Sequence, residues 1–322
     1  MGVKIVQTAH AVPTKIMTNY DLSQIMDTSD EWIRSRTGIS QRHIATTETT
    51  SSLCGQVAEQ LLQQAQLPAT ALDFIVVCTM SPDYFTPATA AVVQGMIGAT
   101  NAFAFDLNAA CSGFVYGLSV VQHYFQTNKE TYGLLIGGEV LSRLINWQDR
   151  STAVLFGDGA AGVLLKNSHT PHLLASDLAT FGDRGGQLTA GYRGGASQMV
   201  NSINQIMPYF QMDGRGIYSF ATRGVPASIE RALQQANLVA DQVDHFILHQ
   251  ANTRIVAQVA KRLQQPLSKF PQNMAAYGNT SAASIPLLLD ECVRAGQIKP
   301  GDILVLSGFG GGLTVGTQIM IY

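Results

Sequence analysis

An approximate repeat of the first half of this 322-residue chain in its second half constrains the fold more than any other feature. Three apolar segments recur at nearly one offset, 172 residues for the first pair and 170 for the other two: 74–76 with 246–248 (FIV and FIL), 111–118 with 281–288 (CSGFVYGL and SAASIPLL), and 134–138 with 304–308 (LLIGG and LVLSG). Strand-like apolar runs alternate with amphipathic helical stretches, which is typical of α/β folds with βαβ units. The sequence therefore predicts a duplicated α/β unit.

The repeat also predicts the domain organisation. We expect a first unit over residues 1–167 and a second over 216–322, joined by a loop-rich connection at 168–215 that is rich in Gly, Ser, Asp and Asn. Equivalent strand ends of a duplicated unit converge, and open α/β sheets place their chemistry at the carboxyl ends of strands. Functional residues are therefore expected at those ends.

The composition excludes several classes of function. Only 13% of the residues are charged, against ~25% in typical globular domains, which indicates a large buried core. The formal net charge of −2 gives no general attraction to nucleic acid or to an anionic membrane. The first residues lack the apolar run of a signal peptide, and no run approaches the ~20 residues that span a bilayer. We expect a cytoplasmic enzyme.

Cys111 is the candidate nucleophile. Apolar residues at 111, 114, 115, 118 and 121 keep helical spacing, so the thiol is expected in the first turn of a helix. Unpaired N–H groups and the positive end of the helix dipole there favour the thiolate, which predicts a lowered thiol pKa. The other interpretation is a small buried hydrophobe, which we favour for Cys54, Cys78 and Cys292. No CxxC spacing supports zinc or thioredoxin-like chemistry.

The second half supplies candidate partners for a thiol. His249 ends a strand-like run, and Asn279 precedes the helix that repeats the one at Cys111. Each also has an ordinary interpretation: His249 could be a buried core histidine, and Asn279 could be a turn or N-cap asparagine. The segment 307–316 (SGFGGGLTVG) follows a buried strand but lacks the Lys-Ser/Thr of a phosphate loop. It predicts a tight turn that presents backbone N–H groups to an oxyanion.

Taken together, these motifs resemble β-ketoacyl-acyl-carrier-protein synthase III of the thiolase superfamily, over nearly the whole chain. The resemblance rests on AACSGFVYGL, FGDGAAG, HQANTRI, YGNTSAASIP, FGGGLTVG and the early DTSDEWIRSRTGI. It implies a duplicated thiolase-like α/β fold, layered α-β-α-β-α with two pseudo-equivalent mixed sheets. A degradative thiolase would need a second cysteine in the glycine-rich segment, and an elongating condensing enzyme a histidine where Asn279 stands. Plant-type polyketide synthases and hydroxymethylglutaryl-CoA synthase also fit less well.

The resemblance implies a decarboxylative Claisen condensation that begins fatty acid synthesis. Cys111 would take an acyl group from acyl-CoA, by default acetyl-CoA, with the N–H groups of Cys111 and Gly311 as the oxyanion hole. His249 and Asn279 would then hold the thioester oxygen of malonyl-acyl-carrier protein while CO2 departs. No metal and no cofactor is implied beyond the CoA substrate.

It also implies the residues that bind substrates and partners, and a homodimer. The expected sets are Trp32, Arg36 and Arg150 for CoA, Arg254, Lys261 and Arg262 for the carrier protein, and Phe85 and Thr86 for a primer pocket closed across the dimer interface. The basic set also fits a solvated helix face. Two alternative functions remain: a related condensing enzyme with another primer or acceptor, and a non-catalytic partner with the same fold.

Overall fold

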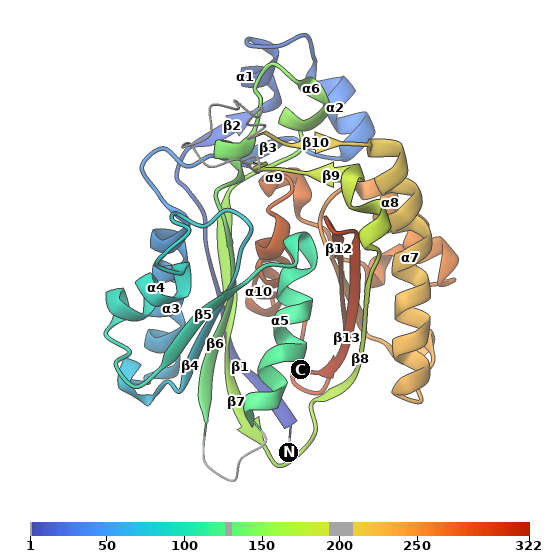
Figure 1. The fold of residues 1–322 in the computed structure, drawn as a ribbon. Helices are drawn as coiled ribbons and strands as arrows, with labels where there is room; N and C mark the ends of the chain where they lie inside the picture. The colour runs from blue at the N-terminus through green and yellow to red at the C-terminus, as the bar shows by residue number, and fades with distance from the viewer. Residues whose placement is uncertain (1, 126–130, 193–208) are drawn as a thin grey trace.

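Two sheets, one from each half of the chain, face each other across a pair of central helices (Figure 1). The structure is a computed structural model, and it describes residues 2–125, 131–192 and 209–322. The first sheet has the order β1-β7-β6-β4-β5 and contains β1 (Gly2–Ala11), β4 (Phe74–Cys78), β5 (Phe103–Leu107), β6 (Tyr132–Glu139) and β7 (Gly159–Ser168). The second has the order β11-β12-β13-β8 and contains β8 (Leu173–Thr180), β11 (His245–Leu248), β12 (Ile303–Gly310) and β13 (Thr314–Ile321).

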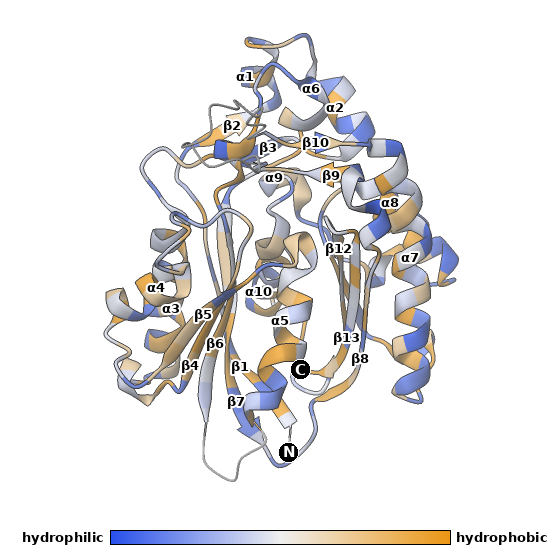
Figure 2. Cartoon of the chain, in the orientation of Figure 1, coloured by the Kyte–Doolittle hydropathy of each residue, from blue (hydrophilic) through white to orange (hydrophobic). Residues whose placement is uncertain are grey.

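Both sheets are mixed. β4 runs parallel to β5 and β6, and β11 runs parallel to β12, whereas the remaining pairs are antiparallel. All five residues of β4 are buried, because helices cover both faces of this strand. Figure 2 shows the corresponding hydrophobic colouring of β4. An uninterrupted apolar run is thus the sequence signature of the central strand.

The helices form three layers, one between the two sheets and one on the outer face of each sheet. The central layer packs against both sheets and consists of α5 (Gly113–Gln122) and α10 (Ser284–Arg294). The outer layers are α3 (Thr50–Ala65) with α4 (Thr89–Ile97) on the first sheet, and α7 (Gly214–Gln235) with α8 (Thr253–Arg262) on the second. The predicted α-β-α-β-α layering is confirmed (Figure 1).

A cap of short elements closes one end of the layers, at the top of Figure 1. It contains β2 (Ile16–Thr18), α1 (Asn19–Ser23), α2 (Asp30–Thr37), β3 (Gln41–His43), α6 (Arg150–Ala153), β9 (Leu188–Thr189), β10 (Gln211–Met212) and α9 (Met274–Tyr277). The parallel strands end below this cap. It therefore roofs the edge where the chemistry of an open α/β sheet is expected.

The duplication is confirmed, but its register differs from the sequence matches by one residue. The two halves repeat at an offset of 171: β6 begins at Tyr132 and β12 at Ile303, while α5 begins at Gly113 and α10 at Ser284. The sequence matches gave offsets of 172 and 170 because one apolar residue can replace another in a buried strand or helix, so apolar segments also match when they are shifted by one residue. In the observed register Cys111 is equivalent to Ala282 rather than to Ser281.

The segment 168–215 is not simply a connecting loop, which corrects the expected boundaries. It contains β8, which pairs antiparallel with β13 and belongs to the second sheet. Only Leu178 and Thr180 of β8 are exposed, but Ser176, Asp177 and Thr180 interrupt its apolar residues, and these polar residues hid the strand. The two units are joined by the few residues between Ser168 and Leu173. Part of the segment, 193–208, lies outside the described residues.

Candidate active site

Cys111 lies in a short 3-10 turn, η2 (Ala110–Ser112), directly before α5. The equivalent turn in the second half is η8 (Ser281–Ala283), directly before α10. Each turn begins with a residue of left-handed backbone, Ala110 at φ 46° and Ser281 at φ 49°. The helix predicted from Cys111 therefore starts two residues later, and the thiol stands just outside its first turn.

The two halves meet closely at these turns because a glycine removes a side chain between them. A Cβ on Gly137 of β6 would lie 2.3 Å from the carbonyl oxygen of Ala282. No side chain fits in that space, so the glycine allows η8 to pack against the first sheet. This contact brings the ends of the first sheet and of α10 to one place.

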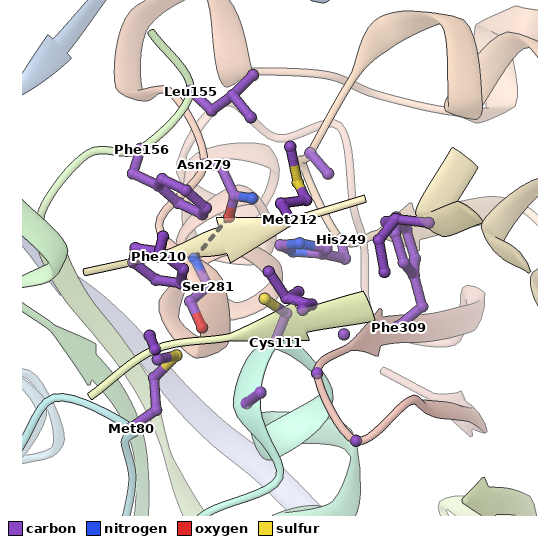
Figure 3. Close-up of a pocket in the computed structure, with 18 of the residues that line it drawn as sticks. Met80, Cys111, Leu155, Phe156, Phe210, Met212, His249, Asn279, Ser281 and Phe309 are labelled. Carbon is purple, nitrogen blue, oxygen red and sulfur yellow. Dashed lines mark hydrogen bonds between the residues drawn. The ribbon is translucent and has the colours of Figure 1, made fainter. Parts of the chain in front are cut away.

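A cavity of about 960 Å³ opens above the turns, and Cys111, His249 and Asn279 all line it (Figure 3). Their thiol, imidazole and amide come from η2, from the end of β11 and from the residues before η8. The structure thus brings together, from both halves, the three residues that the sequence predicted as a set.

The Cys111 thiol is more deeply buried than its predicted position implied. Its residue is 6% exposed, and this burial raises the pKa of the thiol to about 12. The nearby Ser281 hydroxyl and the N–H of Cys111 itself lower the pKa, but by less than burial raises it. The prediction of a lowered pKa is therefore wrong. Desolvation of the thiol outweighs the two hydrogen bonds that favour the thiolate.

His249 is buried and neutral. It is 2% exposed, and burial lowers the pKa of its imidazole to about 3. Its backbone N–H donates to the carbonyl of Ser307, 2.9 Å away, which fixes the strand end. The ring packs edge-on against Phe309, with centroids 5.2 Å apart. A neutral imidazole in this position serves as a hydrogen-bond donor or acceptor rather than as a cation.

Asn279 is held by both its backbone and its side chain. Its backbone forms a parallel bridge to the first half, with its N–H donating to Leu155 and its carbonyl accepting from Gly157. Its Oδ1 accepts from the N–H of Ser281 at 2.9 Å, and this bond defines which way the amide is turned. The amide nitrogen is therefore the end that faces the cavity.

The glycine-rich turn lies against the nucleophile. A Cβ on Gly310 would stand 2.8 Å from the backbone nitrogen of Cys111, so only glycine permits this approach. Among the hydrogen bonds of the described residues, none uses the N–H of Gly311. Gly311 lines the same cavity as Cys111. The geometry fits the predicted oxyanion hole.

Comparisons with known proteins agree with this geometry. The family model of 3-oxoacyl-[acyl-carrier-protein (ACP)] synthase III matches residues 105–182. The model of the C-terminal part of the same family matches residues 233–322. The chain is 55% identical over 321 residues to a β-ketoacyl-[acyl-carrier-protein] synthase III of Lactobacillus helveticus, covering 99% of this chain and 98% of that one. A crystal structure of the synthase III of Aquifex aeolicus is 38% identical, covers both chains completely and superposes with a TM-score of 0.92.

The chain belongs to the 3-oxoacyl-acyl-carrier-protein synthase III family. It is therefore an acyltransferase of the condensing type, the class that begins fatty acid synthesis, and its fold is thiolase-like.

The apolar wall of the cavity was missed by the sequence analysis. It includes Met80, Phe156 and Phe210, and the last two rings stack with centroids 4.2 Å apart (Figure 3). Phe210 precedes α7 in the segment that was expected to be loop. Nothing in its spacing or neighbours marks it as a cavity residue.

A buried carboxylate, Glu139, supports this wall and was also missed. It lies at the end of β6 and accepts hydrogen bonds from the hydroxyls of Thr79 and Ser81 and from the N–H of Met80. Burial raises the pKa of its carboxyl to about 7. Glu139 therefore holds residues 79–81 against the cavity.

The three residues predicted to bind CoA lie together beside the cavity. Trp32 and Arg36 line it, and the Arg36 guanidinium lies 4.8 Å from the centre of the Trp32 ring. The Arg150 guanidinium lies 5.2 Å from the same ring and donates to the carbonyl of Asp27. An aromatic face with two adjacent cations is thus present.

The other predicted contacts are more dispersed. Arg254, Lys261 and Arg262 are exposed along α8, although Arg254 also donates to the carbonyl of Ser35. Phe85 is 81% exposed, and neither Phe85 nor Thr86 lines the cavity. The expected primer-pocket pair is therefore not part of the pocket of its own chain, because the loop that carries it points outward.

The described part of the chain shows neither a membrane-spanning helix nor a metal-binding cluster. None of its helices combines the length and the hydropathy that crossing a membrane requires. No three of its His, Cys, Asp or Glu side chains are grouped as a metal ion would need.

Proposed function

We propose that the chain condenses a short acyl-CoA, by default acetyl-CoA, with malonyl-acyl-carrier protein to give 3-oxoacyl-acyl-carrier protein, CO2 and CoA. The observation that carries the proposal is the convergence of one thiol with an imidazole and an amide in a single apolar cavity. The names of the relatives support the substrate class.

In the first half-reaction the Cys111 sulfur attacks the thioester carbon of acyl-CoA, and CoA leaves with the thiol proton. Burial raises the pKa of the free thiol to about 12, so the sulfur attacks as it loses its proton rather than from a standing thiolate. The N–H groups of Cys111 and Gly311 stabilise the tetrahedral oxyanion. The product is an acyl-enzyme.

In the second half-reaction malonyl-acyl-carrier protein enters and loses CO2. Negative charge moves to its thioester oxygen, where His249 and Asn279 donate hydrogen bonds to the enolate. Each such donor contributes about 3–4 kcal/mol when it binds the transition state more tightly than the ground state. The enolate carbon attacks the acyl-enzyme and releases Cys111. Oxidation states balance without a redox partner, so we propose that no cofactor is needed.

Trp32 stacks the CoA adenine in this proposal, and Arg36 and Arg150 meet its phosphates. Arg254, Lys261 and Arg262 receive the acidic carrier protein. The stacked rings of Phe156 and Phe210 line the cavity, and in this proposal they form the wall that limits the length of the primer. This wall favours a short acyl chain over a long one.

The proposal includes a homodimer formed through β5. This strand ends the first sheet, and Phe103 on it is 48% exposed. Pairing of two β5 edges would cover that ring, and the loop carrying Phe85 and Thr86 would then close the primer pocket of the partner subunit. Sedimentation of Phe103→Asp tests this, and an unchanged dimer would contradict the β5 interface.

Two assays test the proposed reaction. Intact-mass measurement after mixing with labelled acetyl-CoA detects the acyl-enzyme, and a primer panel with malonyl-acyl-carrier protein measures condensation. A non-catalytic partner protein would give neither signal. Preference for a long or branched primer would favour the alternative of a related condensing enzyme.

A further inference from the structure

Ser284, the first residue of α10, contacts the histidine of the site. It is 2% exposed, and its Oγ lies 2.6 Å from Nδ1 of His249. The backbone N–H of Gln250 also points to this Oγ, at 3.4 Å. Both side chains are thus buried together, and their hydrogen bond has no competition from solvent.

The protons of this contact can be assigned by counting donors and acceptors. A serine hydroxyl has one hydrogen to donate and two lone pairs to accept with. If Nδ1 of His249 carried the proton, Ser284 would accept from both Nδ1 and Gln250, and its own hydrogen would have no acceptor among the described contacts. If Ser284 donates to Nδ1, each of the three groups is paired. Buried polar groups are rarely left unpaired, which decides for the second arrangement.

We propose that Ser284 is a positioning residue that holds His249 in the tautomer protonated at Nε2, with that N–H directed into the cavity. The catalytic consequence rests on the proposed role of His249 in condensation. Asn279 is arranged in the same way, since Ser281 occupies its oxygen and leaves its NH2 group for the cavity. In both His249 and Asn279, a hydrogen bond to the acceptor atom of the side chain thus determines where its donor N–H points.

The duplicated half provides an internal contrast. Position 284 is equivalent to Gly113 at the offset of 171, where α5 begins. A Cβ on Gly113 would lie 3.2 Å from the Cβ of Cys78 and 3.4 Å from that of Ala282. A hydroxyl is therefore present at this position only in the half that carries His249.

The tautomer can be measured without any variant of Ser284. We would label the seven histidines with ¹⁵N, assign His249 by comparison with His249→Gln, and record its ring nitrogen shifts. The proposal expects a protonated Nε2 and an unprotonated Nδ1 at neutral pH. A protonated Nδ1 would overturn it, whatever the activity assays show.

Ser284→Ala tests the consequence for catalysis. Condensation should fall roughly 10-fold, the effect of losing one buried hydrogen bond, while formation of the acyl-enzyme stays within about twofold. Ser228→Ala is the matched control, because it removes a buried hydroxyl of α7 that bonds Asp177 and Thr317 outside the cavity. It should leave both half-reactions unchanged.

The outcomes separate this proposal from the proposed function. Unchanged condensation in Ser284→Ala, with strong loss in His249→Ala, would refute only the positioning role. Unchanged condensation in His249→Ala would refute the proposed role of His249, while the nitrogen shifts would still report the tautomer. Equal loss of acylation and condensation in Ser284→Ala would indicate general distortion and would also refute positioning.

Discussion

The turns before α5 and α10 have the same backbone conformation but carry different side chains to the cavity. In each, an asparagine oxygen accepts from the N–H two residues ahead, Asn108 from Ala110 at 3.0 Å and Asn279 from Ser281 at 2.9 Å. Asn108 is exposed, whereas Asn279 is 7% exposed. Burial converts a structural turn residue into a candidate catalytic donor, and the difference lies in the surroundings rather than in the local geometry.

The side chain after the left-handed residue differs as well. The first turn carries Cys111, and the second carries Ala282, which packs against Gly137 of β6. In the proposed reaction the nucleophile thus comes from one half, and the two donors to the enolate, His249 and Asn279, come from the other. The proposed chemistry is therefore divided between the two copies of the fold.

The largest expected effect follows removal of the thiol. Cys111→Ala should form no acyl adduct with acyl-CoA, because no other cysteine of the chain lines the cavity. Intact-mass spectrometry after exposure to labelled acetyl-CoA measures this. Cys292→Ala is the control and should acylate normally. A persistent adduct in Cys111→Ala would break the assignment of the nucleophile to the first turn.

Removal of a donor from the second half should affect only the later step. His249→Ala and Asn279→Ala should each lower condensation by at least ~10²-fold, the usual loss for one oxyanion donor, and should still form the acyl-enzyme. Single-turnover acylation and steady-state condensation are measured side by side. If either variant fails to acylate, the division of labour between the two turns is wrong.

A smaller effect is expected at the mouth of the cavity. Trp32→Ala should raise the KM for acyl-CoA by roughly 10-fold, since base stacking contributes about 1–3 kcal/mol. The KM for malonyl-acyl-carrier protein should change much less, because the carrier arm lacks the adenine. Lys261→Ala is the opposite control and should affect the carrier protein alone. Equal changes for both substrates would mean that Trp32 shapes a shared entrance.

The smallest expected effect follows removal of Asn108, and it tests the comparison between the two turns directly. Asn108→Ala removes the turn bond of the first half, worth about 1 kcal/mol, and should lower the melting temperature by a few degrees. Condensation should change by less than about threefold, in contrast to Asn279→Ala. Calorimetry and the condensation assay measure the two quantities. Asn108 also lines the cavity, so a catalytic loss as large as that of Asn279→Ala would show that the Asn108 amide itself takes part in the reaction.

The sequence predicted the duplicated α/β unit, its resemblance to a family predicted the layers, and both indicated three residues that the structure brings together in one cavity. Buried strands such as β4 are continuous apolar runs, and Cys111, His249 and Asn279 stand at strand or helix ends with distinctive neighbours. Their gathering in one cavity follows from the duplication. Their individual roles stay predictions until the variants are assayed.

Other features depend on distances that a linear pattern does not contain. The strand β8 has an exposed face, so its composition resembled a loop. The pKa of Cys111 is governed by how deeply the folded chain buries it, and helix position alone suggested the opposite direction. Ser284 and Phe210 acquire their contacts with His249 and Phe156 only through tertiary packing.

The division of the site between the halves has a consequence for the order in which a newly made chain becomes reactive. Synthesis from the N-terminus produces Cys111 well before Asn279 and the turn at 310–312. Until β12 and η8 pack against the turn that carries Cys111, the thiol lacks both the glycine turn and the amide. A ribosome-bound chain that ends before β12 (Ile303–Gly310) therefore carries the candidate nucleophile without the glycine turn, and we expect activity only after that turn has been made and packed.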